Sequence, residues 1–397
     1  MGNLPHSTFG NIYLKTANPF NYAGETVTGE VYLNLLQAFP GNTISLKIKG
    51  KEECQWEETQ TRWQDNADGT RTSVPETIEH KGHNTFYRHK LPIFVFNYES
   101  IAPGQYCFPF SMIMGNHLPG TFYEKDHKFS ATIKYKIKVE LSPHHHNKQS
   151  VKDLKYTQEL ILREPIKNQM MYNVPIENSI NATTWCCMSQ GVSKIKCFFE
   201  KNNYCPGELA NMISEIDNSQ CDLPVRHVNI RLLMNIRLKA NHGKEHNISE
   251  TMNSYDLPGI GPHDTALAER RKIAGIYLTN QVRNRGLQPS TSGSLIRCEY
   301  FLSVKTVLDG VTCCSADPEV RIPLTIFAPP LMNFNQVQVP ENWKPQVMPP
   351  YNCVFSEGYA YASQKTGMPQ PMMNSPVQPF GMAGPQMNFP GPGGYQN

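Results

Sequence analysis

Hydrophobic and polar residues alternate along several stretches of the chain with a period of two. The pattern is clearest in residues 131–141, where the apolar positions are Ile133, Tyr135, Ile137, Val139 and Leu141. Successive side chains of a β-strand point to opposite faces of a sheet, so this period is typical of a strand with one buried face. Residues 43–50, 229–240 and 319–327 repeat the period. Many such strands with turn residues between them predict antiparallel β-sandwiches rather than a parallel α/β sheet.

One segment follows a helical period instead. Residues 263–275 begin with a capping residue, Asp264, and the residues that would share a helix face are Leu267, Arg271 and Ile273. This segment lies inside a long polar stretch, residues 240–294, with few apolar positions. We therefore expect one short helix within loop insertions.

Residues 101–122 contain no charged side chain and are nearly long enough to span a bilayer. Asn, His, Pro and Gly crowd into residues 116–120, however, and a lipid-facing helix there would leave backbone groups unpaired. We therefore place the stretch in a soluble fold, as a strand whose inward positions are Tyr106, Phe108 and Phe110. Pro109 within this strand predicts an edge or a bulge, because proline has no N–H to donate.

Composition narrows the function classes. The chain has 397 residues, enough for two or three domains. Its net charge of +3 gives no strong attraction to nucleic acid, which we do not expect as a partner. None of the 11 cysteines lies in a C-x-x-C motif, which argues against zinc ribbons and thioredoxin-like chemistry. The first ten residues do not resemble a secretory signal, so we expect a cytoplasmic protein.

A faint repeat divides the chain into two halves. Residues 21–35 and 203–218 both place Asn-Tyr just before Gly-Glu and a predicted strand. The copies are about 180 residues apart, too far for a solenoid, so two tandem copies of one sandwich domain are the better interpretation. After residue 330 the chain is rich in Pro, Met, Gly and Gln and cannot bury enough apolar surface to order itself. The predicted parts are an N-terminal sandwich at 1–165, a linker at 166–179, a C-terminal sandwich at 180–330 and a disordered tail at 331–397.

These segments, in this order, resemble the arrestin fold and, within it, the α-arrestins, the arrestin-domain-containing trafficking adaptors. In the first half the resemblance runs through residues 21–35, 43–56, 101–112, 117–122 and 131–141. In the second half it runs through residues 186–209, 228–240, 295–308 and 319–330. It covers about residues 8–330 and implies an all-β protein of two tandem arrestin-like, immunoglobulin-type β-sandwiches.

The resemblance also implies a function. We expect a non-enzymatic adaptor in membrane-protein trafficking, endocytosis or endosomal sorting, recruited from the cytoplasm to the plasma membrane or endosomes. Its expected partners are the cytoplasmic tails of membrane proteins, clathrin adaptors or ubiquitin machinery, and anionic membranes. The alternative is a scaffold subunit of a retromer-like coat complex, which does not select cargo itself.

Catalysis and metal binding have little support in the sequence. The chain has no G-x-S-x-G, P-loop, H-E-x-x-H or dinucleotide-binding motif, so we expect no enzymatic activity and no cofactor. His144, His145 and His146 are consecutive imidazoles that suit a transition metal. Consecutive extended residues converge poorly on one ion, so a solvated hairpin loop is the alternative that we favour. No metal site is expected elsewhere.

Two sets of residues are candidates for binding partners. Lys134, Lys136 and Lys138 lie on the polar face of one predicted strand, where they suit anionic headgroups or a phosphorylated tail. An ordinary solvated face is the alternative. Tyr351 and Val354 fit the Y-x-x-Φ sorting signal read by clathrin adaptors, although such a short pattern also arises by chance. The chain lacks P-P-x-Y, since Pro349-Pro350-Tyr351 is one residue too short, so ligase recruitment by that route is not supported.

Overall fold

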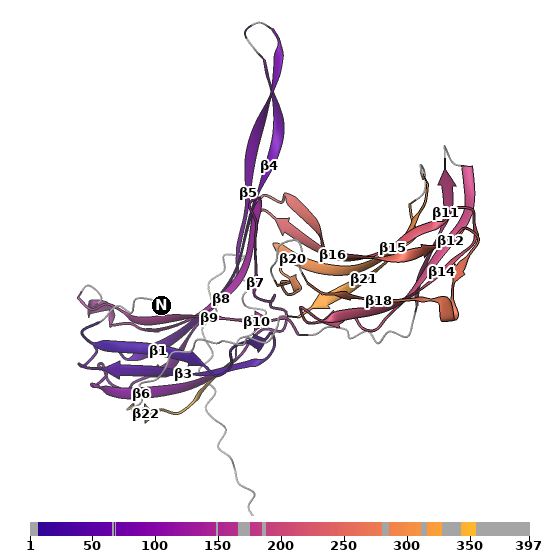
Figure 1. Cartoon of the computed structure of the whole chain (residues 1–397). Helices are drawn as coiled ribbons and strands as arrows, with labels where there is room; N and C mark the ends of the chain where they lie inside the picture. The colour runs from indigo at the N-terminus through magenta and orange to yellow at the C-terminus, as the bar shows by residue number, and fades with distance from the viewer. Residues whose placement is uncertain are drawn as a thin grey trace, which may run out of the picture. The chain divides into compact units, whose positions relative to one another are not determined.

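The computed structural model describes residues 7–65, 67, 69–147, 150–165, 175–184, 188–279, 286–310, 316–327 and 343–354. Residues 1–357 form one compact unit, and its described elements are nearly all β-strands (Figure 1). Two single turns of 3-10 helix, η1 (His145–Asn147) and η2 (Ala268–Arg270), complete the described secondary structure. No helix in the described residues is long and apolar enough to cross a membrane.

The N-terminal sandwich consists of two mainly antiparallel sheets that enclose a core. In the first sheet the order is β1 (Gly10–Thr16), β3 (Thr26–Leu35) and β6 (Gly104–Ile113), with β22 (Gln346–Val347) and β23 (Tyr351–Val354) beside β6. In the second sheet the order is β5 (Arg71–Val95), β4 (Thr43–Asp65), β8 (Phe129–Leu141) and β7 (Phe122–Lys125), and β9 (Leu154–Leu160) also pairs with β8. A short parallel pair joins β2 (Asn21–Tyr22) and β10 (Leu162–Arg163).

The C-terminal sandwich repeats this plan. Its first sheet has the order β11 (Ile176–Thr184), β12 (Met188–Phe199), β14 (Leu209–Cys221) and β17 (Thr265–Ala266), and β18 (Lys272–Tyr277) also pairs with β14. Its second sheet has the order β13 (Asn203–Tyr204), β21 (Glu319–Ile326), β20 (Ile296–Leu308), β15 (Val225–Lys239) and β16 (Glu245–Ile260), with β19 (Thr291–Ser292) beside β20. The all-β prediction of two tandem sandwiches is therefore confirmed.

The alternation seen in the sequence matches the burial of the strands. All the apolar positions predicted to face inward in β8 are buried, and so are those of β4, β15 and β21. In β6, Phe108 and Phe110 are buried as predicted, whereas Tyr106 is half-buried. The period of two therefore placed the correct face of each of these strands against the core.

Residues 240–294 differ from the prediction. The expected helix at 263–275 is wrong, because the chain there forms β17, the single turn η2 and β18. The expected loops are also partly wrong, because β16 is a long strand that pairs with β15 along nearly its whole length. Few side chains of β16 are buried. Its backbone pairing needs no apolar period, and so the strand left no pattern in the sequence.

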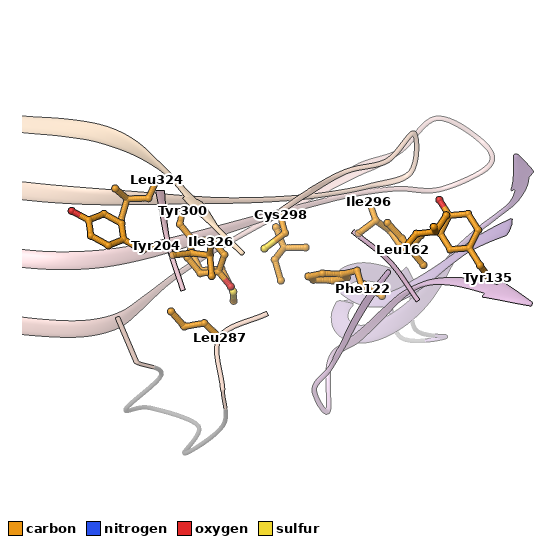
Figure 2. Packing of buried hydrophobic residues seen from close by; sticks show 14 of the residues in the cluster. Phe122, Tyr135, Leu162, Tyr204, Leu287, Ile296, Cys298, Tyr300, Leu324 and Ile326 are labelled. Atoms are coloured by element: carbon orange, nitrogen blue, oxygen red, sulfur yellow. The ribbon is translucent and has the colours of Figure 1, made fainter. Parts of the chain in front are cut away.

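The two sandwiches share one continuous apolar core. Phe122, Tyr135 and Leu162 of the N-terminal sandwich belong to the same buried cluster as residues of β20. Figure 2 shows these side chains together with Ile296 and Cys298. The core thus runs from one sandwich into the other.

Two carboxylates of the N-terminal sandwich hold one segment of the C-terminal sandwich. The side chain of Glu52 accepts hydrogen bonds from Ser294 N–H at 2.8 Å, the Ser294 hydroxyl at 2.6 Å and Leu295 N–H at 2.8 Å. Glu164 accepts hydrogen bonds from Ser292 N–H at 2.7 Å and from its hydroxyl at 2.9 Å. Burial raises the pKa of Glu52, against the opposing effect of its hydrogen bonds. We call Glu52 and Glu164 the carboxylate clasp.

The segment expected to be a disordered tail contains structure that the composition did not indicate. β22 and β23 pair in parallel with β6, so residues 343–354 return to the N-terminal sandwich. Residues 328–342 and 355–397 lie outside the described residues, as does most of the predicted linker, 166–174. The proposed domain boundaries stay predictions.

Candidate anion-binding face

Cationic side chains gather on the outer face of the sheet formed by β5, β4 and β8. In each strand the alternation that turns apolar residues inward turns lysine or arginine outward. The three lysines predicted as a binding site, Lys134, Lys136 and Lys138, lie here on β8. Their neighbours on the same face are Lys47, Lys49 and Lys51 of β4 and Arg88 and Lys90 of β5. We call these eight residues the basic face.

The strand register arranges the basic face in rows. Lys47 lies opposite Lys138 on one side and Lys90 on the other. Lys49 lies between Lys136 and Arg88 in the same way, and Lys51 lies opposite Lys134. Neighbouring strands are about 4.8 Å apart and alternate residues about 7 Å apart. Like charges at these spacings repel each other, so the face favours an anionic partner.

In each of the two outer rows one carboxylate forms ion pairs with two lysines. Glu140 pairs with Lys47 at 2.7 Å and with Lys138 at 3.0 Å. Burial raises the pKa of Glu140, but the hydrogen bonds from these lysines outweigh it and lower the pKa to about 2. Glu53 pairs with Lys134 at 2.6 Å and with Lys51 at 3.3 Å. The hydrogen bond from Lys134 is the main reason that the pKa of Glu53 is lowered.

The middle row is different. Within the described part of the chain, no ion pair involves Lys49, Arg88 or Lys136. Glu159 of β9 is the strand neighbour of Lys136 on the side away from β4. The pKa of Lys49 is lowered, first by burial and then by the charges of Lys51 and Arg88. We call Lys49, Arg88 and Lys136 the open row, because a bound anion would relieve their mutual repulsion.

A groove continues from the basic face towards the free edge of β1. It has a volume of about 1160 Å³ and is lined by the start of β1, by β9 and by the loop before it. Lys90 and Glu140 belong both to this groove and to the surface around the basic face. Lys152 and Lys155 add two more cations to its wall.

The other predicted site residues lie elsewhere. Tyr351 and Val354 are in β23, on the opposite sheet of the N-terminal sandwich from the lysines, so the structure does not bring the two candidate sites together. His144 and His145 line the groove, and His144 Nε2 lies 2.8 Å from the carbonyl oxygen of Glu99. In the described residues, no three His, Cys, Asp or Glu side chains are grouped to hold a metal ion.

Sequence reasoning found three members of the basic face and missed the other five. Lys47 and Lys49 were on the polar side of a predicted strand, but nothing indicated that this strand lies beside β8. Arg88 and Lys90 lie in a strand that was not predicted at all. The available signal was the shared alternation of lysine with apolar residues at 43–50 and 131–141, which is what two neighbouring strands of one basic face would show.

Comparisons with known proteins agree with this architecture. Residues 10–162 match the family model "Arrestin (or S-antigen), N-terminal domain", and residues 189–331 match "Arrestin (or S-antigen), C-terminal domain". The chain is also similar to the Arrestin domain-containing protein A of Dictyostelium discoideum, with 26% identity over 311 residues. That match covers 77% of this chain and 49% of the relative, so the chain spans about half of the relative's length. With both arrestin domains in order, the chain belongs to the arrestin family as an arrestin-domain-containing protein.

Proposed function

We propose that this protein is a non-enzymatic adaptor in membrane-protein trafficking, and that its basic face binds anionic groups on cytoplasmic tails or on the membrane that carries them. The observation that carries the proposal is the open row, whose three cations take part in no ion pair among the described residues. Family membership supports an adaptor role, because arrestin domains act by binding.

The groove supports the tail-binding part of the proposal. It lies against β1, and β1 pairs with β3 alone among the described strands, so its other edge has backbone groups to offer. An extended peptide can bind to such an edge by adding a strand. Acidic or phosphorylated residues of that peptide would then meet Lys90, Lys152 and Lys155.

Affinity purification from cells, with mass spectrometry, tests this proposal. The full chain is compared with a variant in which Lys49, Arg88 and Lys136 are all replaced by Glu. A matched control replaces Lys194, Arg226 and Arg271, which are exposed on the C-terminal sandwich, and changes the net charge equally. We expect membrane proteins to be recovered with wild type and control and lost with the open-row variant. Equal recovery with all three would contradict the proposal, and co-purification in one large stoichiometric complex would favour the coat scaffold.

A further inference from the structure

On a second surface of the N-terminal sandwich, an extended segment of the same chain is bound along the edge of a sheet. Residues 343–354, which we call the strap, run along the outer edge of β6 (Figure 1). Gln346 and Val347 lie opposite Tyr106 and Cys107, and Met348 N–H donates a hydrogen bond to Cys107 O at 2.9 Å. Without the strap this edge of β6 would be open, because β6 pairs on its other side with β3.

The strap is anchored by a tryptophan. The ring of Trp343 lies 5.7 Å from that of Tyr32 and 6.5 Å from that of Tyr13, in edge-on contacts that favour aromatic pairs. Just beyond it, Lys344 N–H donates a hydrogen bond to Gln105 Oε1 at 3.1 Å. Trp343 is half-buried, and an aromatic anchor of this kind is where binding energy concentrates in interfaces between proteins.

The receiving surface is unusual for the outside of a sandwich. Tyr13, Tyr32 and Cys107 are direct neighbours across β1, β3 and β6 and lie on the outer face of the sheet. Outer faces of antiparallel sheets are ordinarily polar. Cys107 is nevertheless only 3% exposed. We call these three residues the outer apolar row, and its composition is explained by a partner that covers it.

Pro109 divides the edge of β6 into two parts. β22 pairs with β6 before this proline and β23 pairs after it, and the register shifts by one residue between them. Proline has no N–H to donate, so pairing is interrupted there. The strap has its own Pro349 and Pro350 at this point. The edge therefore selects a segment with two short extended parts and a break between them.

We propose that the outer edge of β6 and the outer apolar row form a second peptide-docking site, which binds an extended partner segment carrying an aromatic anchor in place of the strap. This site is separate from the basic face, which lies on the other sheet. The strap belongs to the same chain and so competes as a tethered ligand, whose effective concentration is typically on the order of millimolar. To displace the strap, a partner must therefore bind the opened site with a dissociation constant well below that concentration.

Binding of a labelled peptide tests the site directly. The probe is a synthetic peptide with the sequence of residues 343–354, and the receptors are the full-length wild type and the full-length Trp343→Ala/Met348→Pro variant. The variant removes the anchor and one backbone donor of the strap, so we expect the peptide to bind it at least tenfold more tightly than wild type. A peptide with Ala at the position of Trp343 is the control and should lose at least tenfold in affinity. Equal binding to both receptors, or none to a variant that melts like wild type, would overturn the proposal.

Hydrogen exchange on the wild-type chain provides an independent measurement if the variant does not fold. The Met348 amide should be protected, because it donates to Cys107 O. Excess unlabelled peptide at millimolar concentration should accelerate its exchange and leave the amides of β3 unchanged. Protection that peptide does not alter would contradict an exchangeable site.

Discussion

The carboxylate clasp gives a measurable prediction about how the two sandwiches are held. Glu52 is fully buried and accepts three hydrogen bonds from Ser294 and Leu295. Each hydrogen bond to a charged acceptor contributes about 1.5–3 kcal/mol, and the cost of burying the carboxylate offsets part of the sum. Truncating one member of such a buried charged group typically costs about 3–5 kcal/mol. We expect Glu52→Ala to destabilise the protein by that amount.

Differential scanning calorimetry of the full chain measures this loss. In a protein of this size each kcal/mol lowers the melting temperature by about 2–4 °C, so the expected decrease is on the order of 10 °C. The matched control is Glu57→Ala, on the same strand but exposed, which should change stability by about 0.5 kcal/mol or less. If Glu52→Ala melts within a degree or two of this control, the carboxylate clasp does not contribute to stability and the prediction is wrong.

The pH dependence of the same residue has a definite sign. Burial raises the pKa of Glu52 above 4.5, so the folded state holds this proton more tightly than the unfolded state. As the pH rises from 4.5 through the folded pKa, Glu52 should therefore lower the stability of the wild type. Glu52→Gln has no carboxyl group to titrate at this position, so the stability of this variant should not decrease over the same pH range.

Two further predictions concern the N-terminal sandwich. Phe108 is buried beside Phe94, with ring centroids 5.1 Å apart. Phe108→Ala should therefore lower the free energy of unfolding by about 3–5 kcal/mol in a urea titration. The control Tyr98→Ala, at an exposed site, should change it very little. The pKa of Glu140 is about 2 in the folded state, against the ordinary value of 4.5. Its contribution to the free energy of unfolding, about 2–3 kcal/mol, is therefore present above pH 4.5 and decreases as the pH falls towards 2. Urea unfolding should show that the free energy of unfolding decreases less between pH 5 and pH 3 for Glu140→Gln than for wild type.

The period of two carried most of the information that the sequence held about the fold. It placed Ile133 inward and Lys134 outward because burial of one face leaves a direct trace in the residue types. β16 left no such trace, because it is held by backbone pairing with β15 and buries few side chains. The expected helix failed for a related reason: Ile273 recurs at helical spacing but is exposed on a strand.

The candidate sites were harder to predict, because they depend on which strands are neighbours. β4 and β8 lie far apart in the chain, and the open row exists only because they pair with Lys49 opposite Lys136. The strap is a similar case. Pro109 correctly indicated an irregular position on β6, but only the pairing with β22 and β23 shows what lies there.

The most direct test of the anion-binding face is flotation of the purified full chain with liposomes. Three lysine or arginine contacts with an anionic surface contribute about 3 kcal/mol, or about 100-fold in affinity. Exposed charges are screened over about 8–10 Å at physiological salt, so binding should weaken as salt rises. Lys134 and Lys138 are engaged with carboxylates, so the open row should matter most.

We predict that wild type floats with liposomes containing phosphatidylserine or phosphoinositides and not with neutral ones. Replacing Lys49, Arg88 and Lys136 by Glu should abolish flotation without lowering the melting temperature, while the equally charged control at Lys194, Arg226 and Arg271 should float like wild type. Equal flotation of wild type and the open-row variant would contradict the account, because the basic face would then be an ordinary solvated surface.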